Sequence, residues 1–328
     1  MEEYRHIEFQ HTRDFSRKIN ATFEFIRQNF KPLAKSLLYI AGPSVLVGSV
    51  MAGLFMSEFF SMSITAQVDP ERIAENFTSP AFWLQMLLMM VFLLVSYVVS
   101  LATINSYVVL YDEKKTNQIE VSEVWGRVQK AFWQYLVTSI ILFGLFIVLY
   151  VMMLIPIALV SQISGFLLFF GILFIIGLIM FLAVSSSLTY FIQSYEKKGF
   201  GEAVVRSYRL VNNGKWWSTF GLVVVLTVIV ILISYVFMIP YYAITFATMF
   251  HDVSERTMEA PAQGYTILTL VFFTLYYMVQ MLLYSLPNVG IAFQYFNLVE
   301  LKEAKGLMEK INSMGKESVA TNRPEEHY

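Results

Sequence analysis

Long runs of apolar residues alternate with short polar segments along the chain. A helix crosses the hydrocarbon core of a bilayer with about 20 residues, and each run reaches that length. The pattern therefore predicts an all-α polytopic membrane protein. Its six transmembrane helices are expected at residues 36–57, 81–111, 133–160, 165–194, 217–248 and 265–296.

The basic residues are sorted by side. If the chain crosses the membrane at each run, all but two of its 23 Lys and Arg residues fall on one side, the exceptions being Arg72 and Arg256. Cytoplasmic loops carry an excess of Lys and Arg, and this bias sets the orientation of the helices. We therefore predict that both termini lie in the cytoplasm and that the loops 58–80 and 249–264 face outward.

The composition narrows the classes of function. The chain is only 14% charged, has no Cys and carries a net charge of −1. The missing Cys excludes disulfides and Cys-ligated metals, and the near-neutral charge gives no reason to expect a nucleic-acid partner. No His lies inside a predicted span, and no Asp, Glu, Lys or Arg lies near the centre of one. Because ionisable residues in membranes usually mark proton pathways or metal sites, we predict no cofactor and no enzymatic activity.

An internal repeat becomes visible when the sequence is shifted by 84 residues. Trp133 then aligns with Trp217, and Pro156 aligns with Pro240. These matches predict three parallel units, each made of a cytoplasmic helix followed by a transmembrane hairpin. The alternative is that aromatic and basic residues recur at the ends of spans in any membrane protein.

The repeat divides the chain into cytoplasmic segments and hairpins, and each hairpin contains two predicted spans. The cytoplasmic segments are the basic amphipathic segment 1–35, the amphipathic helices 112–132 and 196–216, and the tail 299–328. The transmembrane hairpins are 36–111, 133–195 and 217–298.

The first cytoplasmic segment is strongly amphipathic. Between Phe15 and Phe30, apolar residues recur at the three- and four-residue spacing of one helix face. The basic residues beside this face are Arg13, Arg17, Lys18, Arg27 and Lys31. A helix of this kind can lie in the headgroup layer with its basic residues toward anionic lipid, so we predict a lipid-surface contact here. The alternative is that its apolar face packs against the undersides of the spans.

Uncharged polar residues lie inside several predicted spans. They are Asn105, Ser185, Ser186, Ser187, Gln280 and Asn288. The structural interpretation is hydrogen bonding between helices, which contributes about 0.6 kcal/mol per contact in membranes. The functional interpretation is the lining of a polar cavity near Pro156, Pro240 and Pro287, which we expect to break their helices and free backbone carbonyls.

Two segments carry a resemblance to a known family. The segment 15–38 (FSRKINATFEFIRQNFKPLAKSLL) and the segment 293–311 (FQYFNLVELKEAKGLMEKI) resemble an uncharacterised family of multi-pass inner-membrane proteins from Bacteroidota. The hairpins are similar to the membrane domain that precedes some glycerophosphodiester phosphodiesterases. The resemblance implies a fold and a location in the bacterial cytoplasmic membrane, but no activity. Similar chains are sometimes labelled beta-carotene monooxygenase, and such iron enzymes need His ligands that these spans do not contain.

Two functions remain open. The first is a non-enzymatic scaffold or envelope-assembly component that binds other proteins, or lipid, through its cytoplasmic amphipathic helices. The second is a permease or lipid-handling protein with a polar cavity between the repeats. A polar cavity lined by Gln280, Asn288 and the serines would favour the second function, and a fully packed interior would favour the first.

Overall fold

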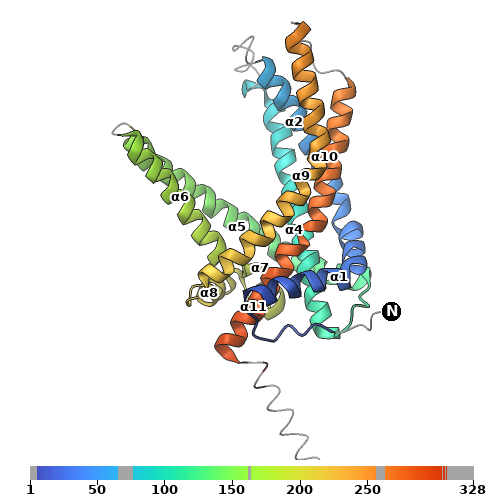
Figure 1. Cartoon of the computed structure of the whole chain (residues 1–328), viewed down its shortest axis with the longest axis vertical. Helices are drawn as coiled ribbons and strands as arrows, with labels where there is room; N and C mark the ends of the chain where they lie inside the picture. The colour runs from blue at the N-terminus through green and yellow to red at the C-terminus, as the bar shows by residue number, and fades with distance from the viewer. Residues whose placement is uncertain are drawn as a thin grey trace, which may run out of the picture.

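The fold is helical throughout the residues that the computed structural model describes, which are 6–65, 77–161, 164–255, 263–304, Gly306 and Met308. No strand occurs within these ranges. The helices shown in Figure 1 are α1 (Phe15–Ile40), α2 (Gly42–Thr65), α4 (Pro80–Lys114), α5 (Val121–Ser161), α6 (Gly165–Ser185), α7 (Thr189–Glu196), α8 (Phe200–Val211), α9 (Trp216–Glu255), α10 (Gln263–Leu283) and α11 (Ser285–Glu303). Arg72 and Arg256 lie outside the described residues.

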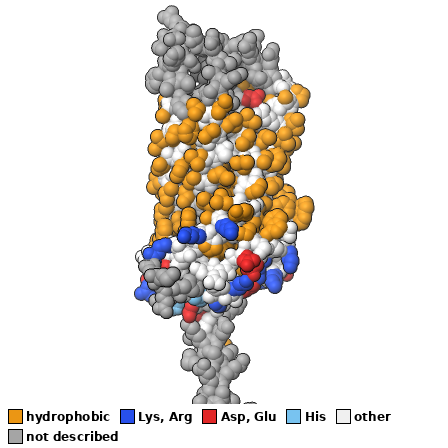
Figure 2. All heavy atoms as spheres, turned by 90° about the vertical axis from the view of Figure 1, so that its right-hand side faces the viewer, with side chains coloured by type: hydrophobic (Ala, Val, Ile, Leu, Met, Phe, Trp, Pro, Cys, Tyr) orange, Lys and Arg blue, Asp and Glu red, His pale blue; other side chains and the backbone are white. Residues whose placement is uncertain are grey.

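The all-α polytopic class is confirmed. Within the described ranges, six helical stretches are long and apolar enough to cross a membrane. Figure 2 shows their hydrophobic side chains as a band, with Lys and Arg side chains gathered along one rim. Large apolar side chains point outward from the band, for example Phe166 at 71% exposure and Ile155 at 66%. Such a surface would be unfavourable in water and is stable in lipid, where apolar side chains need no protein cover.

The spans form two parts that meet at the basic end. Figure 1 shows the α5–α6 hairpin diverging from α2, α4 and α10, while α7, α8 and α11 lie where the parts join. In an apolar 18-residue stretch of the α5 span only 11% of the residues are buried, against 39% in the corresponding stretch of the α4 span. The diverging hairpin therefore presents most of its surface to lipid.

The main hydrophobic core lies toward the basic end and includes residues of α1, α4, α7 and α11. α1 runs across the base of the bundle in Figure 1. Ahead of α1, Phe9 is 1% exposed, and its ring lies 4.8 Å from that of Phe293 and 5.0 Å from that of Phe296. The backbone N–H of Ile7 donates to the Tyr111 hydroxyl at 3.0 Å. The segment before α1 is thus fixed by aromatic packing, which the sequence pattern did not predict.

Two of the three expected helix breaks were wrong. Pro156 lies inside the continuous α5, and Pro240 lies inside the continuous α9. A proline removes one backbone hydrogen bond and clashes with one carbonyl, but neighbouring groups in a membrane bundle satisfy the freed carbonyl and the helix continues. α9 bends along its length in Figure 1 without ending. Pro287 alone lies beside a break, as the third residue of α11.

Several segment boundaries also differ from the expectation. The expected first span, 36–57, is divided between α1 and α2, and the expected sixth span, 265–296, is divided between α10 and α11. The expected cytoplasmic helix within 112–132 is not separate, because Val121 begins α5 and this helix continues into the span. The expected fourth span, 165–194, is split into α6 and α7. α8 is a separate short helix, as expected for 196–216. The repeat of three units stays a prediction.

Candidate functional site

The fourth span breaks at its run of three serines. The Ser186 hydroxyl donates to the Leu182 carbonyl at 2.9 Å, and the Ser187 hydroxyl donates to the Val184 carbonyl at 2.7 Å. Serine side chains that bond to nearby carbonyls compete with the helical backbone ladder. α6 therefore ends at Ser185, and α7 restarts at Thr189.

The last span breaks at a comparable set of polar groups. The Ser285 hydroxyl donates to the Leu282 carbonyl at 2.6 Å, and the Asn288 side-chain amide donates to the Tyr284 carbonyl at 2.7 Å. Pro287 has no N–H to contribute to the ladder. The carbonyl that Pro287 leaves without a donor is that of Leu283, and the Ser285 and Asn288 side chains bond to the carbonyls on either side of it.

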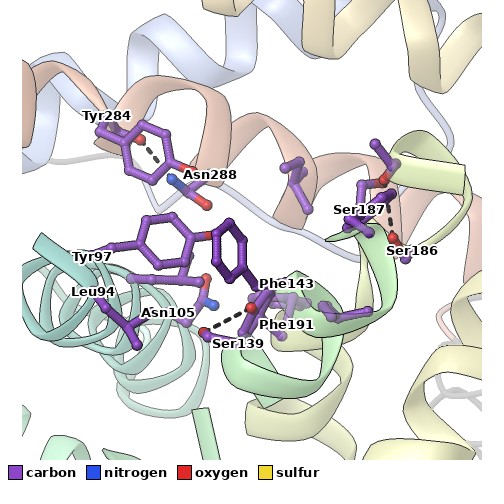
Figure 3. A pocket seen from close by; sticks show the side chains of 16 residues that line it. Leu94, Tyr97, Asn105, Ser139, Phe143, Ser186, Ser187, Phe191, Tyr284 and Asn288 are labelled. Atoms are coloured by element: carbon purple, nitrogen blue, oxygen red, sulfur yellow. Dashed lines mark hydrogen bonds between the residues drawn. The ribbon is translucent and has the colours of Figure 1, made fainter. Parts of the chain in front are cut away.

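A cavity of about 460 Å³ lies between these two breaks. Its lining comes from α4, α5, α6, α7 and α11, together with the residues of the breaks themselves. Four of the six polar residues predicted from the sequence line it: Asn105, Ser186, Ser187 and Asn288. Figure 3 shows these side chains around one space, with Tyr97 and Tyr284 beside Asn288. The structure therefore brings together polar groups from three spans that lie far apart in the sequence.

Three tyrosines that the sequence did not single out also line this cavity: Tyr97, Tyr190 and Tyr284. The ring of Tyr97 lies 6.4 Å from that of Tyr190 and 6.0 Å from that of Tyr284. The Ser139 and Tyr190 hydroxyls are 2.9 Å apart and share a hydrogen bond. Tyr97 remains 39% exposed, so part of this residue is open although its hydroxyl interacts with those of Tyr190 and Tyr284.

Asn105 is held in place by a buried hydrogen-bond network. Its side-chain amide donates to the Tyr135 hydroxyl at 3.0 Å, and this hydroxyl donates to the Tyr190 carbonyl at 2.8 Å. Tyr135 is 1% exposed and also lies 2.5 Å from the Ser194 hydroxyl. Sequence reasoning missed all four tyrosines, because aromatic residues are common throughout membrane helices and none of these stands in a distinctive motif.

The remaining two predicted polar residues line neighbouring cavities. Gln280 faces a cavity of about 230 Å³ between α4 and α10, which shares Tyr97 and Tyr284 with the larger one. Ser185 lies beside a cavity of about 330 Å³ between α5, α6 and α8. Its hydroxyl accepts from the Asn212 side-chain amide at 3.0 Å, so Ser185 has a structural role at this junction.

The three cavities have uncharged walls. Among the described residues that line them, none is Asp, Glu, Lys, Arg or His. The charged groups beyond α7 pair with one another: Glu196 lies 2.6 Å from Lys198 and 3.1 Å from Arg206. The hydroxyl of Tyr295 also donates to Glu196 at 2.6 Å. Within the described ranges, no group of three His, Asp or Glu side chains could hold a metal ion.

The predicted lipid-surface residues in α1 and just before it divide into two groups. Arg17, Arg27 and Lys31 are exposed, whereas Arg13 is half-buried with its guanidinium 5.1 Å from the Phe293 ring centre. Lys18 is 1% exposed, so its assignment to the lipid surface was wrong. The apolar face itself is largely open: Phe15, Phe23 and Phe30 are 40%, 42% and 56% exposed.

Lys18 instead links α1 to α9 and α11 through buried hydrogen bonds. Its ammonium donates to the Gln294 side-chain oxygen at 2.6 Å and to the Ser218 hydroxyl at 2.9 Å. Burial lowers the pKa of Lys18 to about 8; nearby Lys215 acts in the same direction, and Asp14 opposes it. The pattern of apolar residues could not reveal this role, because α1 packs through the face next to its apolar stripe.

The functional interpretation of this site rests on its own residues, and the family resemblance noted from the sequence stays a prediction. Comparisons of the chain with protein-family models, with curated proteins and with solved structures find no match.

Proposed function

We propose that this integral membrane protein binds a membrane-borne amphiphile in the 460 Å³ cavity and handles it without chemical change. The observation that carries the proposal is the convergence of Asn105, Ser186, Ser187 and Asn288 on that cavity, beside two helix breaks. Hydrophobic walls with a few convergent polar groups are typical of small-molecule sites. A polar cavity is also the feature that favours a permease or lipid-handling protein over a scaffold.

The proposed setting is a bacterial cytoplasmic membrane with both termini inside. The asymmetry of Lys and Arg supports this orientation. The divergence of the α5–α6 hairpin supports lateral access, because an amphiphile can approach the junction from lipid without crossing water.

Filling the cavity should remove the bound amphiphile. Ala183 lines the cavity and is exposed, so Ala183→Trp places an indole in the space that the ligand would occupy. We expect the purified wild-type chain to retain about one lipid per protein, and the variant to lose most of it, because a buried ligand needs the volume of its pocket. Mass spectrometry of lipid extracted from protein in mild detergent measures the ratio.

The matched control is Ala158→Trp, on the exposed outer part of α5 and away from the lining of the three cavities. It should retain lipid as the wild type does. Equal retention by both tryptophan variants would show that the cavity holds no ligand.

A scaffold role has separate support on α1. Its exposed stripe of Phe15, Phe23 and Phe30 lies beside the exposed Arg17, Arg27 and Lys31. We propose that this stripe inserts into the headgroup layer and leaves the basic side toward lipid phosphates, where each charge contributes about 1 kcal/mol. Partner proteins would then bind around this helix.

A fluorescent label can locate the stripe, because the chain has no native Cys to compete for it. An environment-sensitive dye on Phe23→Cys should be quenched by quencher-labelled lipid when the full-length protein is in anionic nanodiscs. The same dye on Glu24→Cys, an exposed neighbour on another face, should be quenched far less. If the two positions respond alike, the stripe does not lie in lipid, and contact with a protein becomes the better explanation.

A further inference from the structure

Along α4 and α5, the lining of the large cavity is more polar at one end than at the other. Define the basic rim as the end of the bundle that carries Lys114, Arg127, Lys198 and Arg206. α4 runs toward this rim, and along it the lining changes from Leu94 to Asn105. These eleven steps span about 16 Å at 1.5 Å per residue.

α5 repeats the same gradient. α5 starts at the basic rim, and its lining residues change from Ser139 near the rim to Phe143 and Phe146 farther away. On α11 the order differs: toward the rim the lining runs from Tyr284 through Asn288 to the apolar Ile291. On α4 and α5 the lining residues nearest the basic rim are therefore polar, and those toward the middle of the spans are more apolar. The Tyr97 hydroxyl joins the polar group through Tyr190, which bonds to Ser139. A lipid of the leaflet at that rim has the same orientation, with its head toward the rim and its chains inward.

The polar end offers hydroxyl and amide groups but no charge. The phenol of Tyr97 interacts with those of Tyr190 and Tyr284, and the Asn105 and Asn288 amides lie nearby. Hydroxyls donate and accept, so these groups can bind an alcohol or an ester. A phosphate would lose its hydration and find no cation among the lining residues that the structure describes, which carries a large cost inside a membrane.

We propose that the cavity selects an uncharged lipid whose head carries a hydroxyl group, bound with that head among Tyr97, Asn105 and Asn288. This inference rests on the proposed function and specifies its ligand class. The cations at the basic rim do not alter this selection, because Glu196 pairs with both Lys198 and Arg206 outside the cavity.

Two lipids that differ only in a phosphate test the selection. Radiolabelled dioleoylglycerol and dioleoylphosphatidic acid are titrated onto the immobilised full-length protein in neutral nanodiscs. We expect dioleoylglycerol to bind about tenfold or more tightly, since an unpaired buried charge costs at least the 1.4 kcal/mol of a tenfold change. Ala183→Trp should abolish the specific binding of dioleoylglycerol.

Removing the Tyr97 hydroxyl tests where the head of the bound lipid lies. Tyr97→Phe removes one oxygen and keeps the ring, so it should weaken dioleoylglycerol binding about fivefold to tenfold, the effect of one hydrogen bond. Tyr150→Phe is the matched control, because Tyr150 is 52% exposed on α5 and lines none of the three cavities. Both variants should leave the weak binding of phosphatidic acid unchanged.

The outcomes separate the inference from the proposed function. If phosphatidic acid binds as tightly as dioleoylglycerol and Ala183→Trp removes both, the cavity binds lipid and the selection for uncharged heads is overturned. If Tyr97→Phe binds dioleoylglycerol like the wild type, the head does not lie at the tyrosines and the proposed pose is overturned. If neither lipid binds and Ala183→Trp changes no lipid retention, the proposed function itself fails.

Discussion

Replacing Gly290 with leucine is expected to prevent folding of the bundle at its basic end. A Cβ atom added to Gly290 would lie 2.3 Å from Leu226 Cδ1 on α9 and 3.6 Å from Thr22 Oγ1 on α1. Leu226 and Thr22 are both fully buried, so neither has space to move into. Overpacking a dense core by a methyl group costs about 1–3 kcal/mol, and a leucine side chain costs more. We expect little monodisperse protein from Gly290→Leu and a lower thermal midpoint in detergent for Gly290→Ala.

Two further variants test whether the close approach of Leu226 causes the loss of stability. Gly144→Ala is the matched control, since nothing lies within 4 Å of the added Cβ and alanine favours helix by about 1 kcal/mol. Leu226→Ala removes the atom that clashes, so adding Gly290→Ala to it should cost much less than in the wild type. A Gly290→Ala chain as stable as the wild type would show that α11 does not approach α9 this closely.

Raising the pH from 7 to 9 is expected to stabilise the protein through Lys18. The folded-state pKa of about 8 lies below the ordinary value of 10.5, so between these values the unfolded chain keeps a proton that the folded chain has lost. Stability therefore rises as the pH rises through 8. At pH 9 the Lys18 contribution to the free energy of unfolding is larger than at pH 7 by about 1.4 kcal/mol, which is RT ln 10.

The comparison with Lys18→Met isolates this contribution. Methionine fills a similar volume without an ammonium, so the variant should lack the pH-dependent gain, while other titrating groups act equally in both proteins. Lys31→Met, on an exposed position of the same helix, should respond to pH like the wild type. Denaturant unfolding of full-length protein in detergent at the two pH values measures the difference. An equal gain in the wild type and Lys18→Met would mean that Lys18 is not buried in the folded state.

The candidate site could be predicted in part. Asn105, Ser186, Ser187 and Asn288 stood out because amides and hydroxyls are unusual inside apolar runs, and the structure places them in one cavity. Tyr97 could not be selected in the same way, since tyrosine is abundant along this chain, at 19 residues. Its importance comes from its position between Tyr190 and Tyr284, which only the packing of three spans creates.

Two prolines and one lysine also show the difference between what the local sequence indicates and what the packing of the helices decides. Pro156 and Pro240 have a local tendency to break helices, yet both lie inside continuous helices. In a bilayer each backbone group must find a partner within the protein, which favours keeping the surrounding helix. Lys18 carries a charge that normally stays in solvent, but the approach of α9 and α11 to α1 encloses it with Ser218 and Gln294.

The sequence by itself determined that the chain is helical and spans a membrane. The length and hydropathy of each apolar run decide whether that run enters lipid, and neither property depends on the neighbouring helices. Only the tertiary structure decided where the spans break, how the α5–α6 hairpin diverges and which polar groups share a cavity. Apolar side chains face lipid and protein equally well, so hydropathy does not specify which helices touch. That choice depends on close fits such as that of the Leu226 side chain against Gly290, which arise only when separate segments meet.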